Sequence, residues 1–255
     1  MTKKQSKHVL ITGAGRGIGA AVSERFVASG YRVTLLGRDA ANLTQQASQL
    51  GKLAQISVCD ITDPSNVADA FEAAANSFGS IDVLVNNAGA ASTAPFLKTS
   101  PEQLQSMLSV NYLGACYCIQ QVLAIMLERN SGRIVNIGSS SSVKGYPYVS
   151  AYSAAKHALM GMTRSLALEI ASSKVTINTV CPGFTETDIV SEAIKNIMQK
   201  TGRTEQQAEG ELTKHNPQKR FVQVDEVAEQ VFYLAEHAPI SVNGQAIMLD
   251  GGETA

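Results

Sequence analysis

Short apolar runs alternate with longer amphipathic stretches along almost the whole chain. Several runs are continuously apolar, as expected for parallel strands that are covered on both faces. Strands are predicted at 7–11, 32–36, 54–59, 83–86, 133–138, 176–180 and 246–249. Helices are predicted at 20–29, 40–50, 64–77, 102–128, 151–172 and 224–236. This alternation predicts an α/β fold, a single-domain doubly wound parallel sheet with helices on both faces.

Composition indicates an ordinary α/β protein with one domain. Of its 255 residues 44% are apolar, and 21 basic residues nearly balance 22 acidic ones, which gives no electrostatic reason to expect nucleic acid or a membrane as partner. No linker or composition break divides the chain, so we expect a single domain over residues 1–255. Residues 1–7 lack the apolar core of a signal peptide, and no apolar run approaches membrane-spanning length.

The spacing of cysteines and histidines predicts no metal site. The four histidines are scattered. The four cysteines, which also lack metal-ligand spacing, are Cys59, Cys116, Cys118 and Cys181. In an α/β protein this usage favours reduced thiols and a cytoplasmic location.

A glycine-rich segment follows the first predicted strand and precedes the first predicted helix. It reads Thr-Gly-Ala-Gly-Arg-Gly-Ile-Gly at 12–19. Glycines at such a turn let the backbone approach a pyrophosphate, and the helix N-terminus offers free N–H groups and positive potential to the phosphates. We therefore predict a dinucleotide site that includes Gly13, Arg16, Gly17, Ile18 and Gly19.

A tyrosine and a lysine are separated by one helical turn in the second half of the chain. Tyr152 and Lys156 share a face of the predicted helix, where the ammonium would favour the phenolate and so lower the pKa of Tyr152. Ser139 follows the preceding strand and would hydrogen-bond a substrate carbonyl beside that phenol. Together these groups predict proton transfer on a C=O/CH–OH pair.

Six motifs in order resemble the short-chain dehydrogenase/reductase family over nearly the whole chain. They are the glycine segment at 12–19, Asn86-Asn87-Ala88-Gly89, Asn111, Ser139, Tyr152-x-x-x-Lys156 and Pro182-Gly183. The segments 133–139 and 182–188 are typical of 3-oxoacyl thioester reductases, which act on acyl-carrier-protein or CoA esters, and of related ketone reductases. The resemblance implies a Rossmann fold, an oxidoreductase activity and a nicotinamide cofactor.

The resemblance also implies a role for each catalytic residue. Tyr152 would protonate the developing alkoxide during hydride transfer, while Ser139 would hold the substrate oxygen beside it. Lys156 would hold the nicotinamide ribose and lower the Tyr152 pKa. Asn111 would anchor a water that links Lys156 to solvent; the alternative is an asparagine that only bonds the backbone of its helix.

Further cofactor contacts are implied at the ends of other strands. Small residues after the fourth strand would let the backbone run beside the cofactor ribose: Asn87, Ala88 and Gly89. A loop after the sixth strand, which we expect to end at Val180, would pass over the nicotinamide and contains Pro182, Gly183, Thr185 and Thr187. Asp60 and Ile61 stand where family members hold the adenine, although Asp60 would equally serve as the approach to the next helix.

The end of the second strand predicts NADP(H) as the cofactor. NAD-selective sites place a carboxylate there, about twenty residues beyond the glycine segment, to bond the ribose 2′-hydroxyl. This chain has Gly37 at that position, Arg38 next to it, and Arg16 in the glycine segment. Two guanidiniums suit a 2′-phosphate. Asp39 is the competing carboxylate, but it lies two residues further on, where the chain should already turn into a helix.

The segment 184–220 is long for a connection, and we expect it to form a variable lid over the substrate. Over 189–220 its basic residues outnumber its acidic ones: Lys195, Lys200, Arg203, Lys214, Lys219 and Arg220 against Glu192, Glu205, Glu209 and Glu211. An acidic carrier such as coenzyme A or an acyl-carrier protein would suit that balance. A solvated pair of amphipathic helices explains it more simply.

The sequence thus predicts an NADPH-dependent carbonyl reductase that acts on a small-molecule ketone or acyl thioester. The alternative is an NAD-dependent secondary-alcohol or hydroxyacyl-CoA dehydrogenase. A non-catalytic dinucleotide-binding sensor is more remote, because it would not need the four catalytic residues. The resemblance further implies a homotetramer, or a homodimer, built through the helices at 102–128 and 151–172 and through the segment 244–252.

Overall fold

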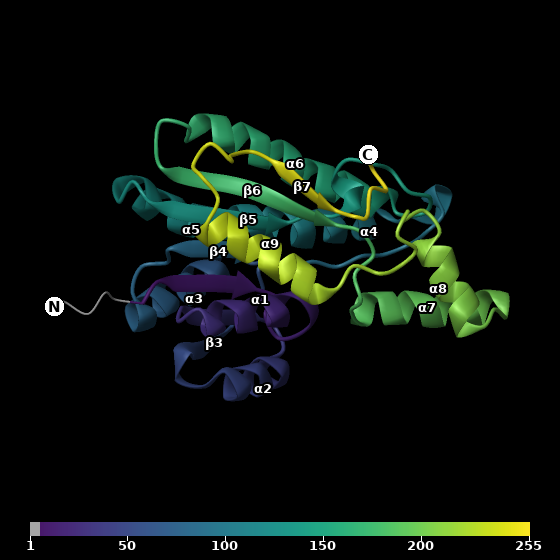
Figure 1. Ribbon diagram of the computed structural model, residues 1–255, viewed down its shortest axis with the longest axis horizontal. Helices are drawn as coiled ribbons and strands as arrows, with labels where there is room; N and C mark the ends of the chain where they lie inside the picture. Colours follow the sequence, from purple (N-terminus) through teal and green to yellow (C-terminus); the bar gives the residue numbers. More distant parts are fainter. Residues whose placement is uncertain (1–5) are drawn as a thin grey trace.

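The computed structural model describes residues 6–255, except for the side chain of Ile189. Its centre is a seven-stranded parallel sheet with helices on both faces (Figure 1). The strands are β1 (His8–Thr12), β2 (Arg32–Gly37), β3 (Ala54–Val58), β4 (Val83–Asn86), β5 (Gly132–Ile137), β6 (Val175–Pro182) and β7 (Ala246–Leu249). The predicted fold class is confirmed, and every predicted strand is present.

Two groups of helices cover the sheet, each over its own apolar cluster. On one face lie α1 (Gly17–Ala28), α2 (Ala40–Leu50) and α9 (Val224–Glu236). On the other face lie α3 (Pro64–Phe78), α5 (Gly114–Glu128) and α6 (Ser150–Glu169). Phe26 and Val231 are buried in the first cluster, and Phe71 and Met126 in the second. The strands between these layers are covered on both sides, which explains their continuous apolar runs.

The strand order places a crevice at the ends of two central strands. Along the sheet the order is β3-β2-β1-β4-β5-β6-β7, so the direction in which the sheet grows reverses between β1 and β4. In doubly wound sheets ligands bind beyond the carboxyl ends of the strands at this reversal. Thr12 ends β1 and Asn86 ends β4, and the glycine segment and the segment 87–89 therefore come together there.

The long helix predicted over 102–128 is interrupted. α4 (Pro101–Leu108) and α5 are joined by a π-helical turn, Ser109–Leu113, that contains Asn111. The side chain of Asn111 explains the turn, because its Nδ2 donates to Met107 O at 3.0 Å and so competes for a helical carbonyl. Single π-turns of this kind are frequent at functional sites.

β6 also runs further than we expected. We predicted its end at Val180, because proline and glycine usually end a strand. Pro182 nevertheless pairs with Leu249 of β7. Pro182 has no N–H to donate, but it is the last residue of the strand. The next amide, Gly183 N, continues the pairing by donating to Leu249 O at 2.9 Å.

One stretch is long and apolar enough to cross a membrane, namely Pro101–Glu128. The expectation that no run approaches this length was therefore wrong. Within the fold the stretch is broken by the π-turn, and α5 packs Ile119 and Val122 against the sheet. Because core helices of globular folds pass the same test, we interpret this stretch as part of the helical layer.

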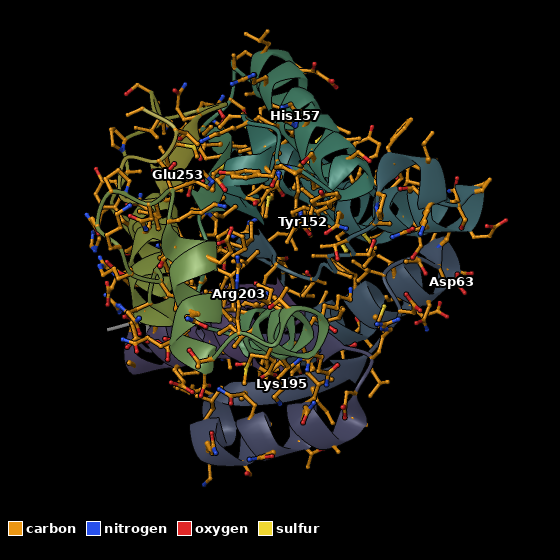
Figure 2. All side chains as sticks on the ribbon, turned by 90° about the vertical axis from the view of Figure 1, so that its right-hand side faces the viewer. Asp63, Tyr152, His157, Lys195, Arg203 and Glu253 are labelled. Carbon is orange, nitrogen blue, oxygen red and sulfur yellow. The ribbon has the colours of Figure 1, made fainter. Side chains whose placement is uncertain are left out.

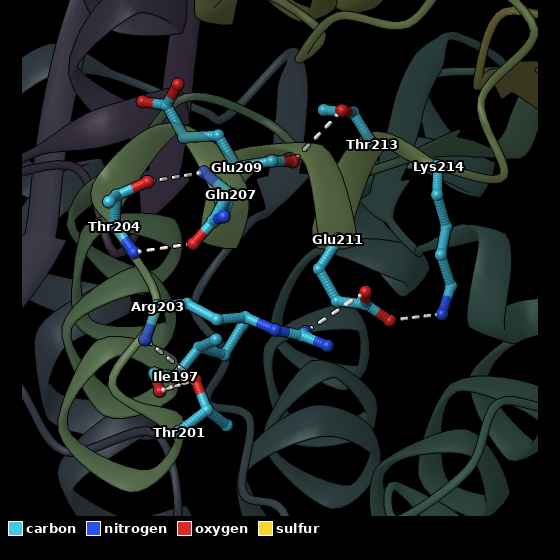
Figure 3. Close-up of polar contacts among 9 residues, drawn as sticks. All are labelled: Ile197, Thr201, Arg203, Thr204, Gln207, Glu209, Glu211, Thr213 and Lys214. Carbon is cyan, nitrogen blue, oxygen red and sulfur yellow. Dashed lines mark hydrogen bonds and ion pairs between the residues drawn. The ribbon is translucent and has the colours of Figure 1, made fainter.

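Two further helices project beyond the sheet, α7 (Asp188–Thr201) and α8 (Glu205–Thr213) (Figure 1). They pack on each other around Val190, Ile194 and Ala208. Between them the chain turns at Gly202, where φ is 69°, and the Thr204 side chain caps α8 (Figure 3). These helices form most of the segment in which the sequence predicts a lid, and their motion over a substrate stays a prediction.

Candidate active site and dinucleotide cleft

A cleft of about 1160 Å³ lies at the carboxyl ends of the strands. Almost all of the predicted site residues line it, although they come from distant parts of the chain. They are Gly13, Arg16, Gly17, Ile18, Arg38, Asp60, Ile61, Asn87, Ala88, Gly89, Asn111, Ser139, Tyr152, Lys156, Pro182, Gly183, Thr185 and Thr187. Figure 2 looks toward this side of the molecule, with Tyr152 near its centre and, below it, Lys195 of α7 and Arg203 of the turn between α7 and α8.

Gly19 is the predicted cofactor residue that does not line the cleft. A Cβ at this position would meet Gly13 O at 2.2 Å and Asn87 Nδ2 at 2.6 Å. Gly19 therefore permits close packing of α1 against the strand ends, as the third glycine of a dinucleotide motif does. Gly19 thus lies behind the cleft wall and contributes to the cofactor site only through this packing.

The glycine turn has the geometry that an anion requires. Gly13 and Gly17 have φ values of 65° and 54°, which residues with a Cβ rarely adopt. α1 begins directly after Arg16, and among the described residues no side chain caps its first amides. Free N–H groups at a helix N-terminus attract anions. The turn thus fits a cofactor pyrophosphate.

Thr12 connects this turn to the end of β4. Its Oγ1 accepts hydrogen bonds from Asn87 N and Ala88 N, both at 3.0 Å. The Asn87 side chain completes the connection, because Nδ2 donates to Thr12 O at 2.9 Å and to Gly13 O at 3.0 Å. The sequence analysis missed this positioning role of Thr12, although the residue opens the motif.

Asn111 is held by the backbone of the loop that follows β4. Its Oδ1 accepts from Ala90 N at 3.2 Å, and its Nδ2 donates to Ala90 O at 2.9 Å. Gly89 lies between Asn111 and Lys156, since a Cβ there would be 2.8 Å from Asn111 Oδ1 and 3.6 Å from Lys156 Nζ. The structure shows the backbone-bonding alternative for Asn111, and the anchoring of a water stays a prediction.

Lys156 is buried in the floor of the cleft. Its Nζ donates to Ile137 O at 2.8 Å. Burial lowers the pKa of Lys156 to about 8, because desolvation disfavours the ammonium. A pKa near neutrality suits a group that exchanges protons during turnover.

Tyr152 does not show the lowered pKa that we predicted from its spacing to Lys156. Burial raises the pKa of the phenol, and the Ser139 hydroxyl only partly opposes this shift. Lys156 Nζ is 5.7 Å from the centroid of the Tyr152 ring and is turned toward a backbone carbonyl. Desolvation therefore sets the direction of the shift, and the effect that opposes it comes from the Ser139 hydroxyl and not from the Lys156 ammonium.

Ser139 stands at the start of a short 3-10 turn, Ser140–Ser142, directly after β5. Its Oγ accepts a hydrogen bond from Ser141 N at 3.1 Å, and its own N–H donates to Ser142 Oγ at 3.1 Å. Because a backbone amide occupies one lone pair of Oγ, the hydroxyl hydrogen is left for a substrate oxygen or for Tyr152. The other serines shape the turn.

The two arginines predicted to hold a 2′-phosphate line the cleft and are each paired with a carboxylate. Arg38 NH1 is 3.9 Å from Asp60 Oδ2, and Arg16 NH1 is 3.2 Å from Asp188 Oδ2 at the start of α7. Both guanidiniums are largely exposed, so these pairs are weak. Asp60 also accepts from Thr62 N at 2.9 Å, which is the helix-approach role that the sequence left open.

Asp39 is committed to α2. Its Oδ1 accepts hydrogen bonds from Ala41 N at 3.0 Å and from Asn42 N at 3.1 Å, which makes it the N-cap of this helix. Its second oxygen, Oδ2, accepts from Asn42 Nδ2 at 2.8 Å, so both oxygens of this cleft-lining carboxylate already have partners in α2. Gly37, which ends β2, leaves the selective position without an acid.

Three of the six basic residues named for the lid segment are paired with carboxylates. Arg203 and Lys214 both pair with Glu211 (Figure 3), and Arg220 pairs with Glu226 at 2.6 Å. Lys200, on α7, is the lid cation that lines the cleft. These pairs support the solvated helix pair rather than a basic docking surface for an acidic carrier.

The sequence analysis missed one wall of the cleft, the loop at 146–149. Tyr146 and Tyr148 both line the cleft from this loop. Tyr148 has a φ of 67°, and its carbonyl accepts from Ala94 N at 2.9 Å, which joins the loop to the segment after β4. The only signal was the Tyr-Pro-Tyr sequence between Ser139 and Tyr152, which has no fixed spacing rule.

Comparison with known proteins gives the family. The family described as short chain dehydrogenase matches residues 7–198. Carbonyl reductase family member 4 of Xenopus tropicalis is 35% identical over 97% of this chain and 98% of its own. D-beta-hydroxybutyrate dehydrogenase of Rhizobium meliloti (strain 1021) is 34% identical over 98% of this chain and 99% of its own.

Solved structures agree with these relatives. A variant of actinorhodin polyketide ketoreductase, determined with NADPH, superposes with a TM-score of 0.93 and 32% identity, covering 99% of each chain. Levodione reductase superposes with a TM-score of 0.90 and 28% identity, covering 97% of each chain. The resemblance that the motifs indicated therefore extends to the whole fold.

Proposed function

This chain belongs to the short-chain dehydrogenase family and is an oxidoreductase of CH–OH/C=O groups, and we propose that it is an NADPH-dependent carbonyl reductase. Its substrate would be a ketone, with a 3-oxoacyl thioester or a similar ketone favoured. The observation that carries the proposal is the convergence of Ser139, Tyr152 and Lys156 in the same cleft as an uncapped glycine turn.

The residues of the cleft account for the proton side of a reduction. A bound nicotinamide would supply the hydride. The Ser139 hydroxyl binds the substrate oxygen, and the Tyr152 phenol donates the proton that the developing alkoxide needs. Because burial raises the pKa of Tyr152, the phenol is protonated at neutral pH, as a general acid must be. Lys156, with its pKa near 8, replaces that proton.

Three features support NADPH over NADH. The position at the end of β2 is Gly37, Arg38 and Arg16 line the cleft, and the competing Asp39 caps α2. The actinorhodin ketoreductase structure also contains NADPH. Each of these guanidiniums has only a weak, exposed carboxylate as its partner, so both are available to a 2′-phosphate. The phosphate would form stronger charge-assisted bonds with them than those carboxylates do.

An NAD-dependent alcohol dehydrogenase is the second candidate. It is favoured by the similarity to D-beta-hydroxybutyrate dehydrogenase. The end of β2 supports the NADPH-dependent reductase instead, because Gly37 leaves the NAD-selective position without an acid and Arg38 lines the cleft beside it. A non-catalytic sensor has no use for the assembled proton-transfer residues.

A substrate panel tests the proposal. Acetoacetyl-CoA and small cyclic and aromatic ketones are supplied with NADPH or NADH, and cofactor absorbance is followed. Tyr152→Phe should lower turnover by about 10²- to 10⁴-fold, because it removes the transferable proton, while cofactor binding stays unchanged. Tyr233→Phe, at an exposed tyrosine of α9, is the matched control. If Tyr152→Phe keeps more than about a tenth of wild-type turnover, the chemistry is wrongly assigned.

A further inference from the structure

A row of polar side chains crosses the otherwise apolar centre of the sheet. Asn86 of β4 pairs in register with Asn136 of β5, which pairs in register with Thr179 of β6. Asn136 and Thr179 are fully buried, and Asn86 is nearly so. Two positions earlier on the same face, these strands carry apolar residues of the core, namely Leu84, Ile134 and Ile177. Because a buried polar group without a partner is costly, such a row has to be held by hydrogen bonds.

Thr163 of α6 completes this row from the helical layer, and it is fully buried. Its Oγ1 accepts a hydrogen bond from Asn136 Nδ2 at 2.9 Å and lies 3.0 Å from Thr179 Oγ1. The same hydroxyl donates to Leu159 O at 2.8 Å. Since a hydroxyl has one hydrogen and two lone pairs, Thr179 is the donor in its bond to Thr163. Thr163 therefore uses its full hydrogen-bonding capacity, and Asn136 Oδ1 continues the chain by accepting from Asn86 Nδ2 at 2.9 Å.

The strand β5 holds α6 at a second point. Lys156 Nζ donates to the carbonyl of Ile137, which is the residue after Asn136. Lys156 and Thr163 are separated by about two helical turns, so they lie on one face of α6. Tyr152 lies one turn before Lys156 on the same helix. The position of α6 along β5 thus decides where both proton-transfer side chains stand.

Apolar packing defines the position of α6 less sharply than these hydrogen bonds do. Burial of apolar surface has no preferred direction, whereas a hydrogen bond weakens steeply with distance and angle. A shift of α6 along the sheet would leave the Thr163 hydroxyl and the Asn136 amide buried without partners, which is the costly case. The polar contact therefore specifies one placement of the helix.

We propose that Thr163 is a positioning residue for the reductase, which holds α6 on β5 through Asn136 and so keeps the Lys156 ammonium on its carbonyl in the floor of the cleft. This role rests on the proposed reductase function. Thr163 does not touch the reacting atoms and acts only through the helix that carries Tyr152 and Lys156. A helix that moves on the sheet would expose the ammonium to more water and weaken its bond to the strand.

Few titratable groups face Lys156 within residues 6–255. Tyr152 lies on the same helix, and Cys181 faces the ammonium from β6. Burial raises the pKa of both groups, so both are neutral near pH 8. The neighbours from the other elements are Asn111 and Gly89, which do not titrate. Solvation of the ammonium is therefore the main influence on the pKa of Lys156, which burial lowers to about 8.

Removal of one hydroxyl tests the proposal. Thr163→Val keeps the shape of the side chain but removes its hydrogen bonds, so kcat with NADPH should fall about 5- to 10-fold, the size of one lost hydrogen bond. Thr176→Val is the matched control, because Thr176 is a buried threonine of β6 between two residues that face α6, so its own side chain faces away. The control should keep the wild-type kcat. Equal losses in the two variants, or no loss in Thr163→Val, would overturn the proposal.

Two milder variants keep the test decisive if Thr163→Val folds poorly. Thr163→Ser retains the hydroxyl and should retain at least about half of the wild-type kcat. Thr179→Val removes only one of the bonds to Thr163, and it should lower kcat in the same direction as Thr163→Val but by less. A wild-type kcat in Thr179→Val, or a loss in Thr163→Ser as large as in Thr163→Val, would contradict the role of the hydroxyl.

The pH dependence of kcat separates positioning from a loss of folded protein. Reduction needs the Lys156 ammonium to replace the proton of Tyr152, so kcat should fall as pH rises through the Lys156 pKa of about 8. In Thr163→Val the ammonium gains water, its pKa rises toward the ordinary 10.5, and this fall should move to higher pH. A variant that is only less stable would keep the wild-type pH profile, and that result would overturn the proposal.

A titration followed by NMR needs no turnover. Lysine labelled with ¹³C at Cε reports each ammonium, and the Lys156 signal is the one missing from Lys156→Arg. The midpoint should lie near pH 8 in wild type and Thr176→Val, and higher in Thr163→Val. An unchanged midpoint in Thr163→Val overturns its positioning role. If wild type reduces no ketone with either cofactor, the reductase proposal fails instead, and the titration still decides whether Thr163 positions Lys156.

Discussion

The backbone of Gly89 passes so close to Asn111 that a Cβ at position 89 would meet Asn111 Oδ1 at 2.8 Å. We therefore predict that Gly89→Ala displaces the Asn111 side chain from Ala90 and places a methyl group in contact with Lys156 Nζ. The variant should lose at least tenfold in kcat/KM, and overpacking should lower its free energy of unfolding by about 1–3 kcal/mol. Steady-state kinetics and urea unfolding measure these effects.

Gly210→Ala is the control for this substitution. Gly210 lies in α8, and no described heavy atom outside its own helix is within 4 Å of an added Cβ. Alanine is the better helix former by about 0.5–1 kcal/mol, so this variant should be at least as stable as wild type and fully active. Equal loss of activity in the two variants would contradict the packing argument.

The cofactor preference is expected to depend on Arg38. Arg38→Asp replaces a guanidinium that lines the cleft by a carboxylate, so the KM for NADPH should rise roughly 10- to 100-fold, the range of one to two charge-assisted hydrogen bonds. The KM for NADH should stay the same or fall. Comparing kcat/KM for both cofactors measures the change.

Lys52→Asp controls for the change in overall charge, because Lys52 is an exposed residue of the short 3-10 turn, Gly51–Leu53, that follows α2. It should leave the ratio of the two kcat/KM values within about twofold, since exposed charges are screened beyond a Debye length. A wild-type preference for NADH would overturn the NADPH assignment.

His8 makes stability depend on pH. Its ring is buried, with Nδ1 2.7 Å from Gly79 O and Nε2 2.8 Å from Thr34 Oγ1. Burial lowers the pKa of His8 below its usual 6.5, and the Arg32 charge lowers it further. The hydrogen bond to Gly79 and the Asp82 carboxylate oppose this shift. The unfolded chain then takes up a proton first as pH falls.

The contribution of the neutral His8 ring to the free energy of unfolding is complete above pH 6.5. It is lost as pH falls from 6.5 toward the lower pKa that His8 has in the folded protein. The loss is at most about 1.4 kcal/mol per pH unit. Urea unfolding at several pH values should give a shallower slope below pH 6.5 for His8→Gln than for wild type. His157→Gln, at an exposed histidine, should keep the wild-type slope; identical slopes for all three proteins would contradict the role of His8.

We predict a homotetramer, or a homodimer, through the outer faces of α5 and α6. Of the apolar residues in these helices, Leu159 and Met160 are buried within the chain, but Leu168 is 80% exposed and Ile125 is 45% exposed. Exposed apolar positions that cluster on a face mark association. Sedimentation velocity at micromolar concentration should show an assembly that Leu168→Glu weakens. Leu97→Glu, at an exposed leucine of the loop after β4, is the control, and a wild-type monomer would contradict the prediction.

Much of the fold and of the cleft could be predicted from local sequence. Strands buried on both faces are mostly apolar, so β1 and β4 are visible as runs of apolar residues. The glycine turn and the Tyr152–Lys156 spacing are likewise local, because a turn or a helix relates residues only a few positions apart. Strand order could then be inferred from the family resemblance.

At particular residues the structure differs from the prediction because of contacts and burial that involve residues far apart in the sequence. Asn111 distorts its helix by bonding Met107 O, and its side chain is held in place by Ala90, a residue 21 positions away. Tyr152 has a raised pKa because its phenol is buried, and the i, i+4 spacing to Lys156 carries no information about burial.

What the sequence by itself determined are features whose cause is local: continuous apolar strands, the glycine turn, the Asp39 cap of α2 and the proton-transfer spacing. What only the tertiary structure decided are the pairing of Arg16 with Asp188, the wall at Tyr146 and the burial of Glu253. These depend on which distant segments pack together and how much water they exclude, because desolvation and contact energies are set in space rather than along the chain.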